Sequence, residues 1–184
     1  RQGKVIIGEQ KMRTAEDMSE AGSSYMRVGT LVIVDRGLIE SRGLNNSDVM
    51  VGIKEELGSS LLVIEKPYEF APYLIPTIAG MLHLSAEGAL SGQIVGIDGI
   101  GTGVLALVAL HLGAAKVVGV DRDSAALKDA QKSLAAAGYN DSEYSLLQED
   151  LNEWYRLDTE DRQRKSGGEI SIRIAHIGPH YKIH

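Results

Sequence analysis

The second half of the chain alternates short apolar runs with segments of helical periodicity. The runs IVGID, AKVVGVD, SLLQED and ISIRIAHI predict four strands. The intervening segments 102–112 and 124–137 predict helices, the second with Leu127 and Leu134 on its apolar face and Gly138 as its stop. Short strands joined by helices imply right-handed crossovers. We therefore expect an α/β fold with a doubly wound, Rossmann-like parallel sheet.

The first part of the chain predicts a small α+β module over residues 1–66. GTLVIVDRGLIES indicates strand structure with a hairpin turn at 35–37, and SLLVIE indicates a further strand. A short helix is expected over 47–57, ended by Gly58. Three of the four prolines follow and mark the passage to the second half. The expected second domain is 67–184, opening with a helix.

Composition narrows the class of protein. Hydrophobic residues make up 43% and charged residues 24% of the chain, which is typical of a globular protein. There are no cysteines, so disulfides, thiolate catalysis and Cys-ligated zinc are excluded. The net charge of −6 argues against a nucleic-acid substrate and suits a small molecule or a basic protein. No apolar run is long enough for a membrane span, and no signal sequence opens the chain, so a cytoplasmic location is expected.

The richest stretch is the turn Gly99-Ile100-Gly101-Thr102-Gly103, with a predicted strand before it and a predicted helix after it. Glycines let a backbone pass close to a ligand, and a helix N-terminus turns unpaired N–H groups toward negative charge. Asp121 closes the next strand, eighteen residues past Gly103. A carboxylate there accepts from two ribose hydroxyls. This spacing predicts a site for a nucleoside cofactor.

Two cofactor classes compete for this turn. A dinucleotide fingerprint can be aligned as Gly101-x-Gly103-x-x-Ala106 with Asp121 on the ribose of NAD, but it leaves Gly99 unexplained. The whole stretch GIGTGVLALVALHLGAAKVVGVDRD resembles the first motif of the class I S-adenosylmethionine-dependent methyltransferases. It looks most like the group of the ribosomal protein L11 methyltransferases. The resemblance implies S-adenosylmethionine as cofactor, held with its methionine part in the turn.

Site residues follow from the resemblance, position by position. It implies that the turn packs its backbone against the methionyl group, that Asp121 binds the ribose, and that Arg122 and Asp150 lie beside the adenine. In the family, the acid that reaches the cofactor's amino group stands two residues before the first glycine, where this chain has Ile97. Asp98 is displaced by one residue and on an ideal strand points to the other face. The expected cofactor contacts are Asp98, Gly99, Ile100, Gly101, Thr102, Gly103, Asp121, Arg122 and Asp150.

The tail IAHIGPHYKIH aligns with the family's substrate-facing loop. The resemblance puts His176 and Tyr181 near the transferred methyl group, and His176 is the candidate base. His176, His180 and His184 are four residues apart, which on a helix would form a metal-binding face, but Gly178 and its following proline oppose a helix there. No metal site is therefore expected.

The expected function is methyl transfer to a protein amine or a small molecule. Two alternatives stay open: an NAD-dependent oxidoreductase, and a non-catalytic module that binds cofactor. The resemblance implies a seven-stranded sheet, whereas the chain stops after its fourth predicted strand. That would expose the apolar face of Ile170, Ile172 and Ile174, so we expect extension beyond His184 or association with a second copy or a partner.

Overall fold

A computed structural model describes residues 25–41, 43, 48, 51, 54–55, 57–58, 61–64 and 74–175. The chain divides into two compact units, Arg1–Ala79 and Gly80–His184. The predicted boundary between residues 66 and 67 lies outside the described residues and stays a prediction.

The described part of the first unit contains a three-stranded sheet in the order β1-β2-β3. β1 (Tyr25–Val28) pairs antiparallel with β2 (Leu31–Asp35), and β2 pairs parallel with β3 (Leu61–Ile64). The hairpin turn predicted at 35–37 is wrong, because the helix α1 (Arg36–Ser41) begins there. The chain instead reverses between β1 and β2 at Gly29, whose φ of 56° suits a tight turn. SLLVIE does form a strand, β3.

The second half follows the predicted order of elements. The helix α3 (Leu74–Ala86) spans the division between the units and is the helix expected to open the second domain. The elements after it are β4 (Ile94–Asp98), α4 (Val104–His111), β5 (Lys116–Asp121), α5 (Ser124–Ala136), β6 (Tyr144–Gln148), α6 (Leu151–Arg156), α7 (Thr159–Ser166) and β7 (Ile172–Ala175).

The four strands of the second unit form a parallel sheet in the order β6-β5-β4-β7. The strand order reverses beside β4, since the chain runs outward to β5 and β6 and then returns to the other side of β4 at β7. Ligands in open α/β sheets bind outside the carboxyl ends of the strands at such a switch point. The Rossmann-like fold predicted from the sequence is thus confirmed, with β7 as an edge strand of the sheet that the structure describes.

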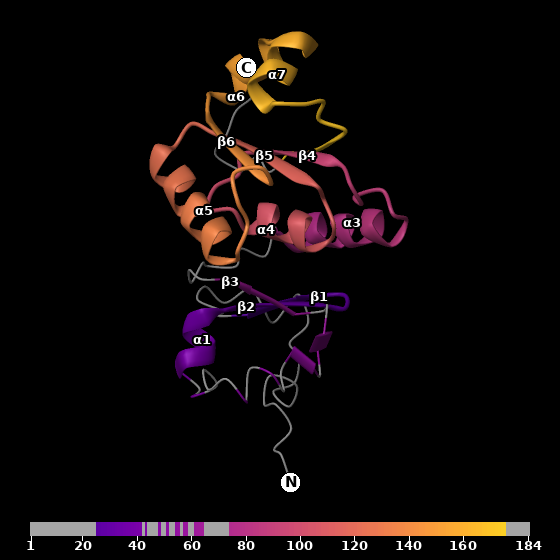
Figure 1. The fold of residues 1–184 in the computed structure, drawn as a ribbon, viewed down its shortest axis with the longest axis vertical. Helices are drawn as coiled ribbons and strands as arrows, with labels where there is room; N and C mark the ends of the chain where they lie inside the picture. Colours follow the sequence, from indigo (N-terminus) through magenta and orange to yellow (C-terminus); the bar gives the residue numbers. More distant parts are fainter. Residues whose placement is uncertain are drawn as a thin grey trace. The chain divides into compact units, whose positions relative to one another are not determined.

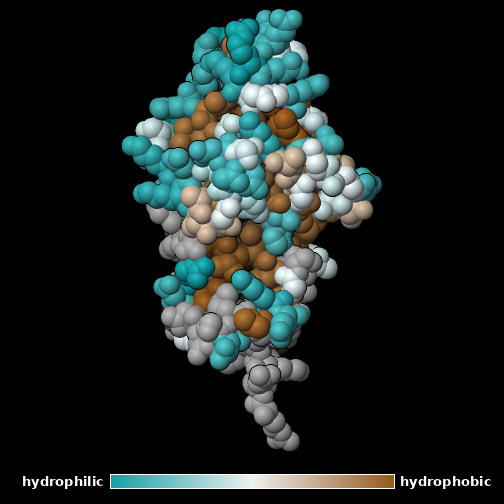
Figure 2. Space-filling view, viewed as in Figure 1, coloured by the Kyte–Doolittle hydropathy of each residue, from teal (hydrophilic) through white to brown (hydrophobic). Residues whose placement is uncertain are grey.

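Helices cover both faces of this sheet (Figure 1). α4 and α5 lie on one face, and α6 and α7 lie on the other. α4 is apolar all round and buried over its residues 104–110, as a helix enclosed by other elements must be. α7 is strongly polar, and Figure 2 shows hydrophilic side chains over that end of the unit.

The charged segment 152–168 is not solvated along its whole length. It contains both α6 and α7, and α6 buries Trp154 completely against Val120 of β5. The expectation that Ile170, Ile172 and Ile174 share one apolar face is wrong. Ile170 lies over Gly96 on the same side as Arg173, whereas Ile172 and Ile174 alternate with Arg173 along the strand.

Candidate cofactor site

The glycine turn joins β4 to α4, and its three glycines have positive φ angles: 75° at Gly99, 54° at Gly101 and 93° at Gly103. A Cβ atom disfavours this left-handed region, so the backbone itself requires glycine at each of these positions. Gly99, which the dinucleotide alignment leaves unexplained, is required like the other two. A Cβ at Gly101 would meet no atom within 4 Å, so the turn has open space beside it.

Backbone hydrogen bonds fix the turn to the end of β5. The amides of Gly99 and Ile100 both donate to the carbonyl oxygen of Val120, at 2.8 and 3.0 Å. The Ile100 side chain is buried, and it packs so closely on Gly119 that a Cβ there would overlap its Cδ1. Ile100 can therefore face a ligand only with its backbone. Gly119 was not singled out from the sequence, although a glycine inside an apolar strand is a signal of such close approach.

Asp121 closes β5 beside this turn, as predicted. Its Oδ2 accepts from the amide of Gly101 at 2.9 Å, and its Oδ1 accepts from the amide of Asp123 at 3.0 Å. The residue is half-buried. Each carboxylate oxygen offers two lone pairs, so both retain capacity for a ribose hydroxyl. Asp121 thus holds the middle of the glycine turn and remains accessible to a ligand.

Asp98 closes β4 but lies on the opposite face of the sheet. It pairs in register with Val120, which packs against Leu151 and Trp154 of α6. Successive residues of a strand alternate between faces, so Asp121 points away from that cluster. The side-chain direction expected for Asp98 from its one-residue displacement agrees with this placement.

On that face, Asp98 is buried and has two strong partners. Its Oδ2 accepts from the Tyr155 hydroxyl at 3.0 Å and from the guanidinium of Arg173 at 2.7 Å. The Arg173 guanidinium carbon also lies 5.0 Å from the centre of the Tyr155 ring. Tyr155 and Arg173 were not predicted as site residues. The one available signal was a lone arginine inside the apolar run ISIRIAHI.

The remaining predicted contacts differ in their burial and in their hydrogen bonds. Thr102 is half-buried within the turn, and Arg122 is exposed directly after β5. Asp150 follows β6 and is the N-cap of α6, with its Oδ1 accepting from the amide of Asn152 at 2.8 Å. Its carboxylate therefore has a structural role that is compatible with a second role toward a ligand.

The predicted acceptor-side residues His176 and Tyr181 lie outside the described residues. β7 ends at Ala175, which pairs in register with Asp98, so the chain leaves β7 at the same edge of the sheet as the glycine turn. Within the described ranges no group of three or more His, Asp or Glu side chains could hold a metal ion. None of the helices described is long and apolar enough to cross a membrane.

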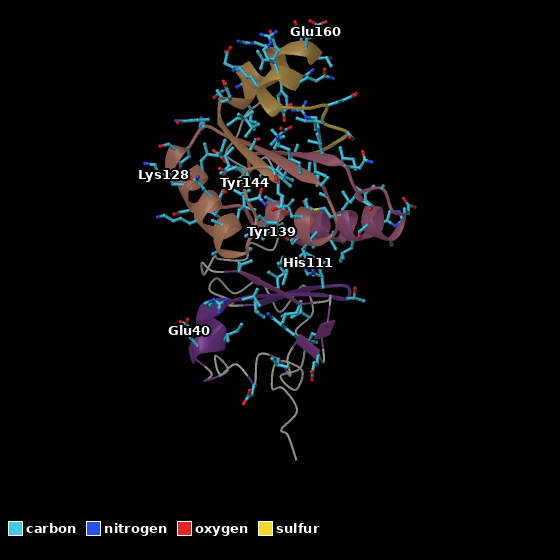
Figure 3. All side chains as sticks on the ribbon, viewed as in Figure 1. Glu40, His111, Lys128, Tyr139, Tyr144 and Glu160 are labelled. Carbon is cyan, nitrogen blue, oxygen red and sulfur yellow. The ribbon has the colours of Figure 1, made fainter. Side chains whose placement is uncertain are left out.

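A groove of about 630 Å³ runs between α5 and β6, away from the glycine turn. Lys128 of α5 and Tyr144 of β6 line it (Figure 3). Burial raises the pKa of the Tyr144 phenol above its ordinary value, and the nearby carboxylate of Asp141 raises it further. None of the predicted cofactor contacts lines this groove.

A parallel sheet with a glycine-rich turn after one strand and an acid closing the next defines a Rossmann-like domain for a nucleoside cofactor. Comparison with known proteins narrows this class. The family model described as ribosomal protein L11 methyltransferase (PrmA) matches residues 77–160. A ribosomal protein L11 methyltransferase of Stenotrophomonas maltophilia (strain K279a) is 54% identical over 45 residues, which are 24% of this chain and 15% of that protein.

The predicted resemblance to class I S-adenosylmethionine-dependent methyltransferases of the L11 group is therefore confirmed for this part of the chain. The aligned segment spans only 15% of the length of that relative. Among solved structures, a ribosomal protein L11 methylase from Lactobacillus delbrueckii subsp. bulgaricus is 17% identical, covering 71% of this chain and 60% of its own, with a TM-score of 0.49. Magnesium protoporphyrin IX methyltransferase from Synechocystis PCC 6803, with bound SAH, is 23% identical. The match covers 65% of this chain and 52% of that protein, with a TM-score of 0.39.

Proposed function

We propose that this chain binds S-adenosylmethionine at the carboxyl ends of β4 and β5 and serves in methyl transfer to a protein acceptor. The observation that carries the proposal is the turn Gly99–Gly103, with positive φ at each glycine and Asp121 bonded to its middle amide. The match of residues 77–160 to a methyltransferase family supports the same cofactor.

The residues of the glycine turn and Asp121 fit S-adenosylmethionine. Gly101 offers a backbone with open space where a side chain would stand, and the Asp121 carboxylate lies beside it. The proposed role of that carboxylate is to accept from the ribose hydroxyls. The other proposed contacts are the backbone of Gly99, Ile100, Thr102 and Gly103 and the side chains of Arg122 and Asp150. When bound, S-adenosylmethionine supplies an electrophilic methyl group on a positively charged sulfur.

The work of the chain in this reaction is to align the acceptor and to manage its proton. Alignment of a nucleophile with the bond that breaks supplies a large share of the rate in such displacements. A protonated amine must also lose a proton before it attacks, and His176 is the proposed base. His176 and Tyr181 follow the end of β7, which meets β4 at Asp98.

A protein acceptor is favoured over a small molecule by the names of the relatives, which are methyltransferases of ribosomal protein L11. The net charge of −6 suits a basic protein as partner. Transfer of a labelled methyl group from S-adenosylmethionine to ribosomal protein L11, with free lysine as the comparison acceptor, tests this choice. Labelling of lysine alone would overturn it.

Cofactor binding is tested separately by calorimetric titration with S-adenosylhomocysteine and NADH side by side. We expect heat of binding and a rise in melting temperature with S-adenosylhomocysteine and neither with NADH. Binding of NADH alone would overturn the proposal and favour the oxidoreductase. Tight binding of S-adenosylhomocysteine without labelling of either acceptor would favour the non-catalytic module.

A further inference from the structure

Asp98, Tyr155 and Arg173 form a compact cluster on the α6 face of the sheet. The Asp98 side chain is only 3% exposed, and its Oδ2 accepts both from Tyr155 and from Arg173, whose side chain is 31% exposed. The guanidinium also stacks near the Tyr155 ring. A buried carboxylate is costly unless it is paired, so this arrangement gives Asp98 the partner that its burial requires.

The pairing of β7 with β4 brings Arg173 to Asp98. Arg173 is the register partner of Gly96, not of Asp98, so its side chain extends along the sheet to reach the carboxylate two residues further on. A Cβ at Gly96 would lie 3.5 Å from Arg173 Cγ and 2.9 Å from Ile170 Cγ2. Gly96 therefore makes room chiefly for Ile170, and the arginine stem lies beside it at an ordinary van der Waals distance.

We propose that Asp98 is a positioning residue, which ties the end of β4 to β7 and α6 through Arg173 and Tyr155, and is not the ligand of the cofactor's ammonium group. This inference rests on the proposed function and concerns the same site. Asp98 directly precedes Gly99, and β7 leads directly to the segment with His176 and Tyr181. The cluster thus joins the cofactor turn to the strand that carries the proposed acceptor segment.

The direction in which Arg173→Met changes the affinity for S-adenosylhomocysteine distinguishes positioning from direct binding. If Asp98 bound the ammonium group, Arg173 would compete with the ligand for the carboxylate, and Arg173→Met would leave affinity unchanged or raise it. If Asp98 positions the turn, Arg173→Met leaves a buried carboxylate without its cation and disturbs the turn that begins at Gly99. We then expect S-adenosylhomocysteine to bind about tenfold more weakly.

A second ligand tests the same point without relying on one variant. 5′-Methylthioadenosine has the nucleoside of the cofactor but lacks the amino and carboxyl groups. Positioning predicts that Arg173→Met weakens both ligands by a similar factor, and that Asp98→Asn leaves their affinity ratio unchanged. Direct binding predicts that Asp98→Asn weakens only S-adenosylhomocysteine.

Three further variants guard against a result that reflects misfolding. Arg173→Lys keeps the charge and is expected to recover part of the affinity. The double variant Asp98→Asn with Arg173→Met buries no unpaired charge, so it is expected to bind better than Arg173→Met alone. Arg156→Met is the matched control, because Arg156 directly follows Tyr155 in α6 but pairs with Glu153 at the surface.

Trp154 offers a readout that needs no ligand. It is the only tryptophan of the chain, it is fully buried, and it directly precedes Tyr155 in α6. We expect its fluorescence to shift in Arg173→Met and in Tyr155→Phe, but not in Arg156→Met.

The outcomes of the two proposals are distinct. If the unsubstituted protein binds neither adenosine ligand, the proposed function fails, and with it the role of Asp98 toward the turn. If it binds both, then unchanged or tighter binding of S-adenosylhomocysteine by Arg173→Met overturns the positioning role. Selective loss of S-adenosylhomocysteine in Asp98→Asn overturns it as well. A common loss for both ligands, with recovery in Arg173→Lys, supports it.

Discussion

Two carboxylates close neighbouring strands of the same parallel sheet, and they differ in their burial and in the groups that contact them. Asp121 is half-buried, and the contacts that hold it come from the backbone amides of Gly101 and Asp123. Asp98 is almost fully buried, and its charge is met by the guanidinium of Arg173. The first has capacity left for hydroxyl groups, whereas the second already has a cation.

A single step in register produces this difference. Asp98 pairs with Val120, the residue before Asp121, so the two carboxylates fall on opposite faces of the sheet. Gly119 lies on the face of Asp121, since a Cβ there would point into Ile100 of the turn. Ile97 pairs with Gly119 and occupies the position where the related family has its acid. What an acidic side chain at a strand end can bind is thus decided first by the face of the sheet to which it points, and only then by the residues next to it in sequence.

The largest effect is expected on the Asp121 face, from Gly101→Val. A side chain there would fill the open space beside the turn, so we expect S-adenosylhomocysteine to bind at least about 100-fold more weakly, or about 2.8 kcal/mol. Gly138→Val is the matched control, because Gly138 also has positive φ and no atom within 4 Å of a Cβ, but it ends α5. Both variants are expected to lose similar stability from backbone strain. Calorimetry that finds normal affinity in Gly101→Val would falsify the placement of the ligand at the turn.

Glycines inside β4 and β5 allow the two faces to be perturbed in parallel. Gly119→Ala drives a Cβ into Ile100, and overpacking of this kind costs about 1–3 kcal/mol of unfolding free energy. Gly96→Ala should cost less, since its Cβ would lie 2.9 Å from Ile170 Cγ2, whereas the Cβ at Gly119 would lie 2.2 Å from Ile100 Cδ1. Urea unfolding measures both. Adding Ile100→Val removes the overlapping methyl group and is expected to restore part of the loss in Gly119→Ala, and no such recovery would contradict the packing argument.

Asp121→Ala tests the ribose contact directly. Loss of hydrogen bonds from a carboxylate to two hydroxyls is expected to weaken binding by about tenfold, or about 1.4 kcal/mol. The comparison of adenosine with 2′-deoxyadenosine provides an internal control. The unsubstituted protein should prefer adenosine, and the variant should lose that preference. A variant that still discriminates between the two nucleosides would remove Asp121 from the ribose site.

Much of the second unit could be predicted from the sequence because its pattern is local. The apolar runs, the helical periodicity of 124–137 and the glycine turn each depend on residues close together in the chain. The hairpin position failed because Asp35-Arg36-Gly37 resembles a turn in composition, although α1 begins within it and the chain reverses at Gly29. Local composition alone did not distinguish a helix start from a turn.

The cluster around Asp98 could not be predicted from the sequence. Asp98 and Arg173 are separated by 75 positions, and their contact depends on the strand order that places β7 beside β4. Burial of Trp154 was missed for the same reason, since α6 has only Leu151 and Trp154 as buried residues among charged neighbours. Such a short helix shows little periodicity, and the sheet surface that it covers decides its orientation.

Asp150, which follows β6, is a third carboxylate to compare with Asp98 and Asp121, and its substitution is expected to have the smallest effect. It caps α6, and it is also the proposed contact of the adenine amino group, so Asp150→Ala would remove both interactions at once. Asp150→Ser separates them, because serine caps a helix about as well as aspartate but has no carboxylate. We expect Asp150→Ala to lose about 1 kcal/mol of stability and Asp150→Ser to lose almost none. Both should bind S-adenosylhomocysteine about threefold more weakly, in keeping with one lost hydrogen bond. Normal binding by a stable Asp150→Ser protein would reduce Asp150 to a helix cap and leave Asp121 as the one carboxylate of the three that serves the ligand.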